Sequence, residues 1–467
     1  MWILERRWKL VKVTYFAFKD GIQGLGGKKR FKVKIFFKKM SLKKINNFLL
    51  FLFVFSLPFT AFSVLKIGEK DIIFSWFLIF LLALLNFPKL HKSGKVITIL
   101  YVWFFILFLT TVKLGFLQGS IPVKGFTQLL TMVGMMVHLP VLYVIFKDKT
   151  FKEIKKLINV LIFSTFILVL YTFYQYSTYF FHFLPKIDIL RNAEIYSIYK
   201  GSGIEGWSGT YRAYGVAPEP TFWASYLLIP LAFLIPYLFS FGKFWIKKII
   251  FFLFFISLIL TFGRSGWITF ALILLISPLI IKTPSILKIS YFLIILISIT
   301  IIFGGVIGNF FKIPIFSDLS FQHRLYAEKA ALEIFSTNPI LGVGFGNFEN
   351  FAEYYLTQRP DFSLLVTHNF YLRMLAETGI LGFLIFLLFL GFLLQVLLKS
   401  QIMIRQIKNS ETEKFIQGLF LAFFSILVVW LFSEGYNFSY IWFIFALMVA
   451  LPQILLKADS KNYEYSN

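Results

Sequence analysis

The chain has 467 residues, of which 58% are hydrophobic and 20% aromatic, and its formal net charge is +25. This apolar fraction is above that of soluble globular proteins, so most of the chain is expected to lie in lipid. The absence of cysteine excludes disulfides, iron–sulfur clusters and thiolate zinc sites. The Lys and Arg residues cluster in short segments between apolar runs, which is typical of membrane topology, so we predict no nucleic-acid partner.

The first 45 residues form a basic segment that lacks a spanning run. They contain 14 Lys and Arg against two acidic residues, which predicts a cytoplasmic segment on anionic lipid headgroups. Alternatively, residues 1–39 are a mis-assigned extension, because Met40 and the basic and apolar residues after it resemble an ordinary start. Residues 46–456 are predicted to be a polytopic membrane domain, and residues 457–467 a cytoplasmic tail.

A spanning helix needs about 20 mostly apolar residues. By this measure the sequence predicts an all-α integral membrane protein with about twelve transmembrane helices, at residues 46–65, 72–87, 96–112, 126–146, 157–181, 221–241, 249–262, 267–281, 289–308, 370–398, 415–432 and 440–456. The runs 249–262 and 267–281 are short and closely spaced, so one long helix is the alternative for this pair.

The distribution of charge decides between these alternatives. With the N-terminus inside, the inner segments contain 33 Lys and Arg and the outer segments 13, as the positive-inside rule favours. A single helix over 249–281 would place the basic segment 399–414 outside. We therefore predict a tight hairpin with Arg264 at its outer tip, and both termini in the cytoplasm.

Two predicted outer segments, 182–220 and 309–369, are too long for simple connections, and long loops usually carry function. The second contains a helical pattern that ends at Asn338-Pro339, as a following proline requires. The glycine-rich stretch 341–348 comes next. It lacks the Gly-Lys-Ser/Thr of a phosphate-binding P-loop, so we interpret it as a tight turn that returns the chain to the membrane surface.

His368 lies where the second loop re-enters the bilayer. Charged side chains at membrane depth cost about 2.5–3.5 kcal/mol, so polar residues there mark function. His368 is equally well a catalytic base or a helix N-terminal residue bonded to a neighbour. The arguments for His91, His138 and His182 are weaker. No histidine pairs with a carboxylate at ligand spacing, so no metal site is predicted.

Three arginines, Arg212, Arg264 and Arg324, come from three outer loops and share the predicted membrane face of His368. Guanidinium groups bind phosphate with two parallel hydrogen bonds and keep their charge at all relevant pH values. This set suits a lipid diphosphate substrate and a base. The alternative is that each arginine reaches into the lipid headgroups.

Four stretches, taken in order, resemble the O-antigen ligase and polymerase family. They are Arg212-Ala213-Tyr214-Gly215 with Pro220, Thr261-Phe262-Gly263-Arg264-Ser265, Arg324 through Gly344, and His368 through Leu372 with Glu377-Thr378-Gly379. The resemblance implies a glycosyltransferase-C-like helical architecture with the large loop between spans nine and ten. It also implies glycan transfer from undecaprenyl diphosphate without a metal or other cofactor.

The resemblance further implies residue roles. Arg212, Arg264 and Arg324 would hold the diphosphate and offset charge on the leaving group. His368 would accept the proton of the acceptor hydroxyl, with inversion at the anomeric carbon. Three further residues are expected to support this site, namely Glu219, Asn369 and Tyr371.

One departure from the family pattern affects the choice of acceptor. Many ligases resemble Arg-x-x-Gly-x-x-x-x-Pro-Asn, whereas this chain has Pro218-Glu219-Pro220-Thr221, which looks more like the polymerase-type members. The implied partners are an undecaprenyl-diphosphate-linked glycan donor, a glycan, lipid or protein acceptor, and the lipids of the bacterial cytoplasmic (inner) membrane. The alternative is a transporter or flippase for a lipid-linked or small anionic substrate. The two halves show no repeat and the spans nearly lack acidic residues, which disfavours that class.

Overall fold

The computed structural model describes residues 41–67, 70–118, 123–181, 184–185, 212–238, 244–281, 319–356, 366–407 and 410–464. The chain divides into two compact units, residues 1–50 and 51–467. In the first unit the described residues are 41–50, which contain the beginning of helix α3 (Leu42–Ser56). Most of the predicted basic segment 1–45 therefore lies outside the described residues.

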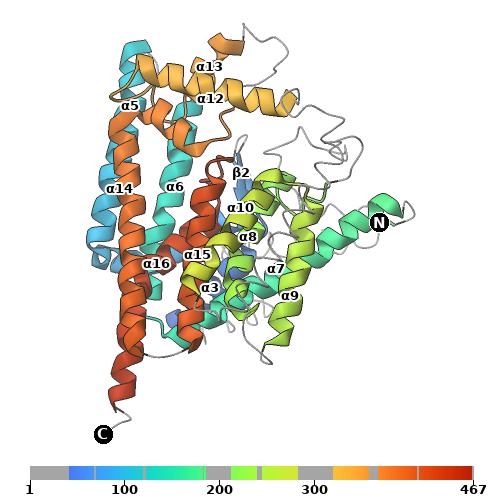
Figure 1. Cartoon of the computed structure of the whole chain (residues 1–467). Helices are drawn as coiled ribbons and strands as arrows, with labels where there is room; N and C mark the ends of the chain where they lie inside the picture. Colours follow the sequence, from blue (N-terminus) through green and yellow to red (C-terminus); the bar gives the residue numbers. More distant parts are fainter. Residues whose placement is uncertain are drawn as a thin grey trace, which may run out of the picture. The chain divides into compact units, whose positions relative to one another are not determined.

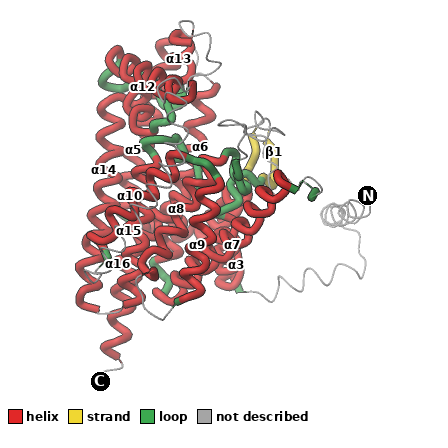
Figure 2. The backbone as a smooth tube through the Cα atoms, turned by 45° about the vertical axis from the view of Figure 1, so that its right-hand side comes forward, coloured by secondary structure: helices red, strands yellow, loops and turns green. Residues whose placement is uncertain are grey.

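The second unit is built mainly of helices (Figures 1 and 2). After α3 they are α4 (Phe74–Asn86), the 3-10 helix η2 (Phe87–Ser93), α5 (Lys95–Gln118), α6 (Val123–Phe146), α7 (Phe151–Phe180), α8 (Pro220–Leu238), α9 (Trp245–Leu260), α10 (Arg264–Ile280), α12 (Leu319–Thr337), α13 (Phe348–Leu356), α14 (Phe370–Ile407), α15 (Ser410–Val429) and α16 (Ser439–Glu464). Helix α12 ends just before Asn338-Pro339, as the sequence predicts.

Several of these helices are long and apolar enough to cross a membrane. Within the described residues there are seven, at Phe74–His91, Gly125–Phe146, Phe151–Thr178, Pro220–Leu238, Phe370–Met403, Ser410–Val429 and Ser439–Lys457. Two shorter apolar helices cover Leu100–Lys113 and Arg264–Ile280. The chain is thus a helical, multi-pass membrane protein. The number of twelve spans stays a prediction, and the predicted span 289–308 lies outside the described residues.

The predicted span 46–65 extends too far, because α3 ends at Ser56. Pro58 follows closely, and a proline disfavours helical backbone in the residue before it. The chain instead turns and forms β1 (Ser63–Ile67), which pairs antiparallel with β2 (Lys70–Ile73). This small hairpin, which the sequence analysis did not predict, leads into α4.

Residues 245–280 form two helices joined by Thr261–Gly263, so the alternative of one long helix is wrong. Rings from the two helices meet side by side, with centroids 5.2 Å apart for Phe255 and Phe270. Gly266 lies so close to α8 that an added Cβ would be 2.7 Å from the Cβ of Ala224. The hairpin is therefore packed tightly on α8.

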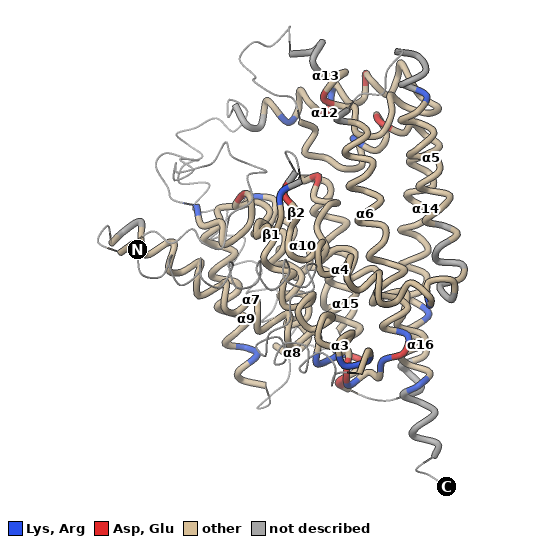
Figure 3. Tube along the Cα trace, turned by 180° about the vertical axis from the view of Figure 1, so that it is seen from behind, with Lys and Arg blue, Asp and Glu red and all other residues tan. Residues whose placement is uncertain are grey.

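Helices α8, α15 and α16 are the most buried spans, whereas in the spans of α4 and α14 only 28% and 33% of the residues are buried. The buried interior contains large aromatic side chains such as Trp223, Trp442 and Phe370. Charged residues gather toward the two ends of the helices, and the middle stretch is almost free of them (Figure 3). This distribution is the one expected for helices surrounded by lipid.

Candidate functional site

His368 lies in the turn that leads into α14, and its backbone is left-handed with φ 50°. For a residue with a Cβ this conformation costs about 1–2 kcal/mol, so the surrounding contacts must hold it. The next residue, Asn369, caps α14, because its Oδ1 accepts a hydrogen bond from the N–H of Leu372 at 3.2 Å. The helix start therefore fixes the position of the histidine.

Helix α12 brings three polar side chains to this turn. The ring of His323 lies 6.0 Å from that of His368, measured between centroids. The side chain of Asn369 is hydrogen-bonded to Glu328, and Arg324 interacts electrostatically with both Glu328 and His368. We call these five residues the His368 cluster. The sequence predicts that Arg324 and His368 share one membrane face, and the structure brings them together.

The electrostatics of the His368 cluster set the protonation of the imidazole. Burial, followed by the charges of Arg324 and His323, lowers the pKa of His368 to about 3. The histidine is thus neutral near pH 7 and carries a lone pair that can accept a proton. Burial raises the pKa of the Glu328 carboxyl, although its hydrogen bond to Asn369 and the charge of Arg324 act in the opposite direction.

Arg212 and Arg264 lie together at a second place, the tip of the α9–α10 hairpin. Arg212 Nε donates a hydrogen bond to the carbonyl of Thr261 at 3.1 Å. The N–H of Ala213 donates to the carbonyl of Leu260 at 3.0 Å. Arg264 is the first residue of α10. Two of the three predicted arginines therefore lie at the same hairpin tip, Arg212 bonded to the turn and Arg264 in the helix that follows it.

The segment that carries Arg212 is anchored by Gln175 of α7. The N–H of Gly215 donates to Gln175 Oε1 at 2.9 Å, and Gln175 Nε2 donates to the carbonyl of Gly215 at 2.7 Å. Gly215 has φ 57°, and an added Cβ would lie 2.8 Å from the ring of Trp223, so only glycine fits. Glu219 stands just before α8 and accepts a hydrogen bond from the hydroxyl of Thr221 at 3.1 Å.

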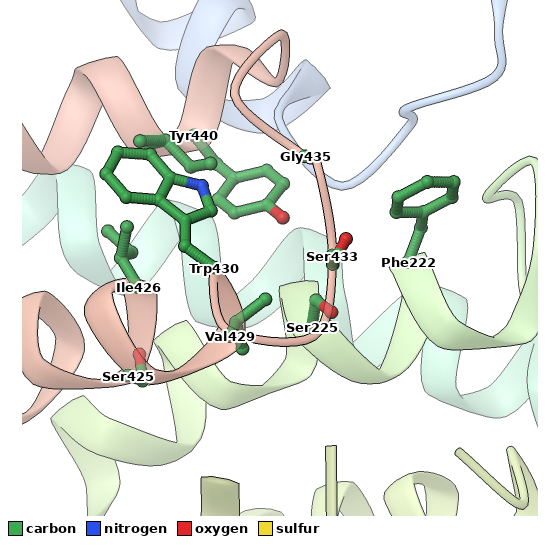
Figure 4. Close-up of a pocket in the computed structure, with 10 residues that line it drawn as sticks. Phe222, Ser225, Ser425, Ile426, Val429, Trp430, Ser433, Gly435 and Tyr440 are labelled. Atoms are coloured by element: carbon green, nitrogen blue, oxygen red, sulfur yellow. The ribbon is translucent and has the colours of Figure 1, made fainter. Parts of the chain in front are cut away.

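A small pocket of about 10 Å³, room for about one water molecule, lies between α8 and the segment that joins α15 to α16 (Figure 4). Its lining includes Phe222 and Ser225 from α8, and Trp430 and Tyr440 from the α15–α16 side. The carbonyl of Trp430 accepts a hydrogen bond from the N–H of Phe370 at 2.9 Å, two residues after His368. Trp430 thus contacts the start of α14 and also lines the pocket beside α8.

Arg373, one turn into α14, is 2% exposed and is surrounded by acidic groups. Its Nε donates to Glu377 at 3.0 Å, and its Nη1 pairs with Glu349 at 3.0 Å and also contacts Glu434. Its Nη2 donates to Gln128 Oε1 at 3.0 Å. We call these five residues the Arg373 network. They pair a buried charge that would otherwise be costly in a membrane.

The Arg373 network also reaches the turn that contains His368. The hydroxyl of Thr367, the residue before the histidine, donates a hydrogen bond to Glu434. The N–H of Phe348, at the start of α13, donates to Glu377 at 3.1 Å. One guanidinium thus ties α6, α13, α14 and the α15–α16 segment to the residue that precedes His368.

The glycine-rich stretch 341–348 does more than turn the chain, because it pairs with a break in α14. The N–H of Gly344 donates to the carbonyl of Glu377 at 2.8 Å, and the N–H of Ile380 donates to the carbonyl of Pro339 at 2.8 Å. Gly379, with φ 62°, interrupts the helical backbone of α14. A Cβ on Gly342 or Gly379 would overlap the opposite backbone, so both positions require glycine. We call this pairing the glycine junction.

Tyr371 and His138, which the sequence also singles out, make hydrogen bonds that hold helices together. The hydroxyl of Tyr371 donates to the carbonyl of Leu427 at 2.8 Å, which fixes α14 against α15. His138 is buried and hydrogen-bonded to Ser439 and to the carbonyl of Gly134, both at 3.0 Å. His182 lies outside the described residues. Across the part of the chain that the structure describes, no three His, Asp or Glu side chains are arranged to hold a metal ion.

Arg373 and Glu377 both lie within the predicted span 370–398, but the sequence does not show which residues they contact. The physical signal was present, since a charge at membrane depth needs a partner and the adjoining outer segments contain Glu349 and Glu434. The sequence did not indicate which acidic residues lie within reach. The Arg373 network therefore emerges from the structure alone.

Part of the chain is similar to a known protein family. Residues 249–387 match the family model described as O-antigen ligase. This match includes Arg264, Arg324 and His368. It begins at residue 249, so Arg212 lies outside it. No curated protein matches the chain. The matched residues contain most of α9, all of α10, the His368 cluster and the glycine junction, and this part of the chain is therefore similar to the O-antigen ligase family.

Proposed function

We propose that this protein is a metal-independent glycosyltransferase on the outer face of the bacterial cytoplasmic membrane. It moves a glycan from undecaprenyl diphosphate to an acceptor hydroxyl, polymerising O-antigen or exopolysaccharide repeats or ligating them. The family match supports an enzyme of the O-antigen ligase type. The observation that carries the proposal is that His368 is held in a left-handed turn beside Arg324, where burial and positive charge lower its pKa.

In the proposed reaction, His368 accepts the proton of the acceptor hydroxyl while its oxygen forms a bond to the anomeric carbon. The bond between that carbon and the phosphate oxygen breaks, and undecaprenyl diphosphate leaves with the electron pair. Arg324, with Arg212 and Arg264, offsets the charge that develops on the leaving group. Attack opposite the leaving group inverts the configuration at the anomeric carbon.

Binding of the donor would raise the pKa of His368. Arg324 is one cause of the low pKa of His368, because its positive charge disfavours a second one. A diphosphate on Arg324 brings negative charge, which raises the pKa of the imidazole and makes it a stronger base. Proton transfer is thereby favoured when the donor is in place.

The acidic sequence Pro218-Glu219-Pro220 favours a polymerase, because it resembles the polymerase-type members more than the ligases. The transporter alternative gains no support from the family match. The glycan profile of a deletion strain separates the two activities. Single repeats without long chains indicate a polymerase, and lipid-linked full-length chains that accumulate indicate a ligase.

The main test compares His368→Ala with Arg212→Ala at matched expression. Removal of a positioned base typically costs about 10²–10⁴ in rate, so His368→Ala should lose turnover while it still binds undecaprenyl diphosphate. Arg212→Ala should lose donor affinity as well as turnover. His91→Ala, at an exposed position, is the matched control and should behave as the wild type.

Two results would contradict the proposal. Near-normal chain growth in His368→Ala removes the general base. If transfer activity is lost in excess chelator and returns when Mg²⁺ or Mn²⁺ is added, the arginines are not the positive charge of the site.

A further inference from the structure

A second charged cluster lies at the end of α15 that is remote from His368. Glu411 lies in the first turn of α15. Trp430 follows the last turn of the same helix and contacts the start of α14, next to His368. A helix of 20 residues is about 30 Å long, so the two ends reach opposite faces of a membrane. Lys155 Nζ lies 2.5 Å from one oxygen of Glu411, and Lys414 Nζ lies 4.0 Å from the other.

A third lysine completes the group from α9. Lys247 Nζ lies 3.2 Å from the ring centroid of Tyr237, and 5.0 Å from that of Phe244. Lys414 Nζ lies over the same two rings, at 5.4 and 4.9 Å. The rings themselves meet edge to face, with centroids 5.1 Å apart. We call Lys155, Lys247 and Lys414, with Glu411 and these two rings, the lysine cluster.

The backbone at the lysine cluster is held in an unfavourable conformation. Phe244, which precedes α9, has φ 67°, a left-handed backbone that is rare for an aromatic residue. Such strain persists where surrounding contacts enforce it, and it concentrates at functional sites. Here it accompanies the placement of the Phe244 ring against Tyr237 and below the two ammonium groups.

The charges of the lysine cluster are not balanced. Three ammonium groups share Glu411, and they come from three helices, α7, α9 and α15. Burial lowers the pKa of Lys247 to about 8, and repulsion from Lys155 and Lys414 contributes in the same direction while Glu411 opposes it. Under these conditions a second anion would stabilise the ammonium groups.

We propose that the lysine cluster binds the phosphate group of an anionic lipid headgroup, at the membrane face opposite to His368. A phosphate presents several oxygens, and three ammonium groups present several donors, so each lysine can give one hydrogen bond. The two rings hold the lysine stems and their charges. The lipid assignment follows from the position of the cluster at the ends of α8 and α15, which are both long enough to span a membrane.

The test uses the full-length protein, purified in neutral detergent and depleted of lipid. Phosphatidylglycerol and phosphatidylcholine are titrated separately, and bound lipid is counted by native mass spectrometry. The variant Lys247→Gln/Lys414→Gln leaves the pair between Lys155 and Glu411 intact, so the fold is preserved. Each lysine that contacts the lipid phosphate is expected to contribute about fivefold to binding, so the double variant should bind phosphatidylglycerol about 25-fold more weakly.

The matched control is Lys152→Gln/Lys156→Gln, which removes the same charge from exposed positions on α7. It should bind phosphatidylglycerol within about twofold of the wild type. Equal loss in both variants, or no loss in the first, overturns the proposal.

A further arm titrates inorganic phosphate against thermal unfolding of the wild type. Protection by inorganic phosphate as strong as that by phosphatidylglycerol would replace the lipid assignment with a soluble phosphate ligand. Because these measurements do not use glycan transfer, their outcome is separate from that of the proposed enzymatic activity.

Discussion

The two ends of α15 lie near charged clusters of opposite composition. At the His368 end, one guanidinium, Arg373, is shared by three carboxylates and is 2% exposed. At the other end, three ammonium groups share Glu411, and the side chain of Lys155 remains 35% exposed. Both clusters join several helices, but the guanidinium of Arg373 is buried whereas the ammonium of Lys155 is partly exposed.

This difference indicates that the charges of the Arg373 network stabilise the fold, whereas those of the lysine cluster are available to bind a ligand. The Arg373 network has a hydrogen-bonding or ionic partner for every nitrogen of its guanidinium. What it does is fix the residue before His368 through Thr367 and Glu434. The lysine cluster has an excess of donors and partial exposure, which is what a site for an external anion requires.

The largest expected effect is that of Arg373→Met. It leaves the buried carboxylates without their cation, and loss of one partner from a buried ion pair costs about 3–5 kcal/mol. Lys155→Gln, in the lysine cluster, is the comparison, and it should cost less than about 1 kcal/mol because the pair is partly exposed. Chemical unfolding in detergent measures both free energies. Similar losses for the two variants would remove the distinction between a closed and an open cluster.

A smaller effect is expected at the glycine junction. Gly379→Ala introduces a Cβ that meets the carbonyl of Ile340, in a left-handed backbone that disfavours any side chain. The free energy of unfolding should fall by about 1–2 kcal/mol or more. Gly391→Ala, in the same helix, is the control, since an added Cβ there meets no atom within 4 Å. Equal stability of the two alanine variants would show that the junction does not hold the loop.

The pH dependence should reveal the influence of Arg324 on His368. The acid limb of kcat/KM reports protonation of the base in the free enzyme. Because the pKa of His368 is lowered to about 3, this residue should cause no loss of kcat/KM between pH 8 and pH 5. In Arg324→Gln one cause of the low pKa is gone, so the acid limb should move to higher pH. A limb near pH 6.5 that is identical in both proteins would contradict this account.

Much of the helical arrangement could be predicted from local pattern. Apolar length identified most of the helices, and the difference in Lys and Arg content between loops correctly favoured two helices over one at 249–281. The helix end at Asn338-Pro339 follows from the missing N–H of proline. The end of α3 was mispredicted because apolar length outweighed Pro58, although proline is the stronger local signal.

The candidate site was less predictable, since it depends on contacts between distant residues. Topology placed His368 and Arg324 on one face, but no local pattern indicates that Arg373 reaches Gln128 or that Thr367 reaches Glu434. Likewise, the partner of Gly379 is set by the packing of the loop against α14. Periodicity describes single elements, whereas these pairs arise only when several elements are assembled.

The glycine junction bears on how such a protein can be recombined with its relatives. Because Gly342 and Gly379 interlock backbone to backbone, the first turns of α14 are bonded to the preceding loop as well as to the rest of their own helix. A crossover at Phe370 would divide this interlocked pair between two parents. A crossover after Ile380 would keep both segments of the pair from one parent, so this loop is best transplanted as the single cassette 319–380.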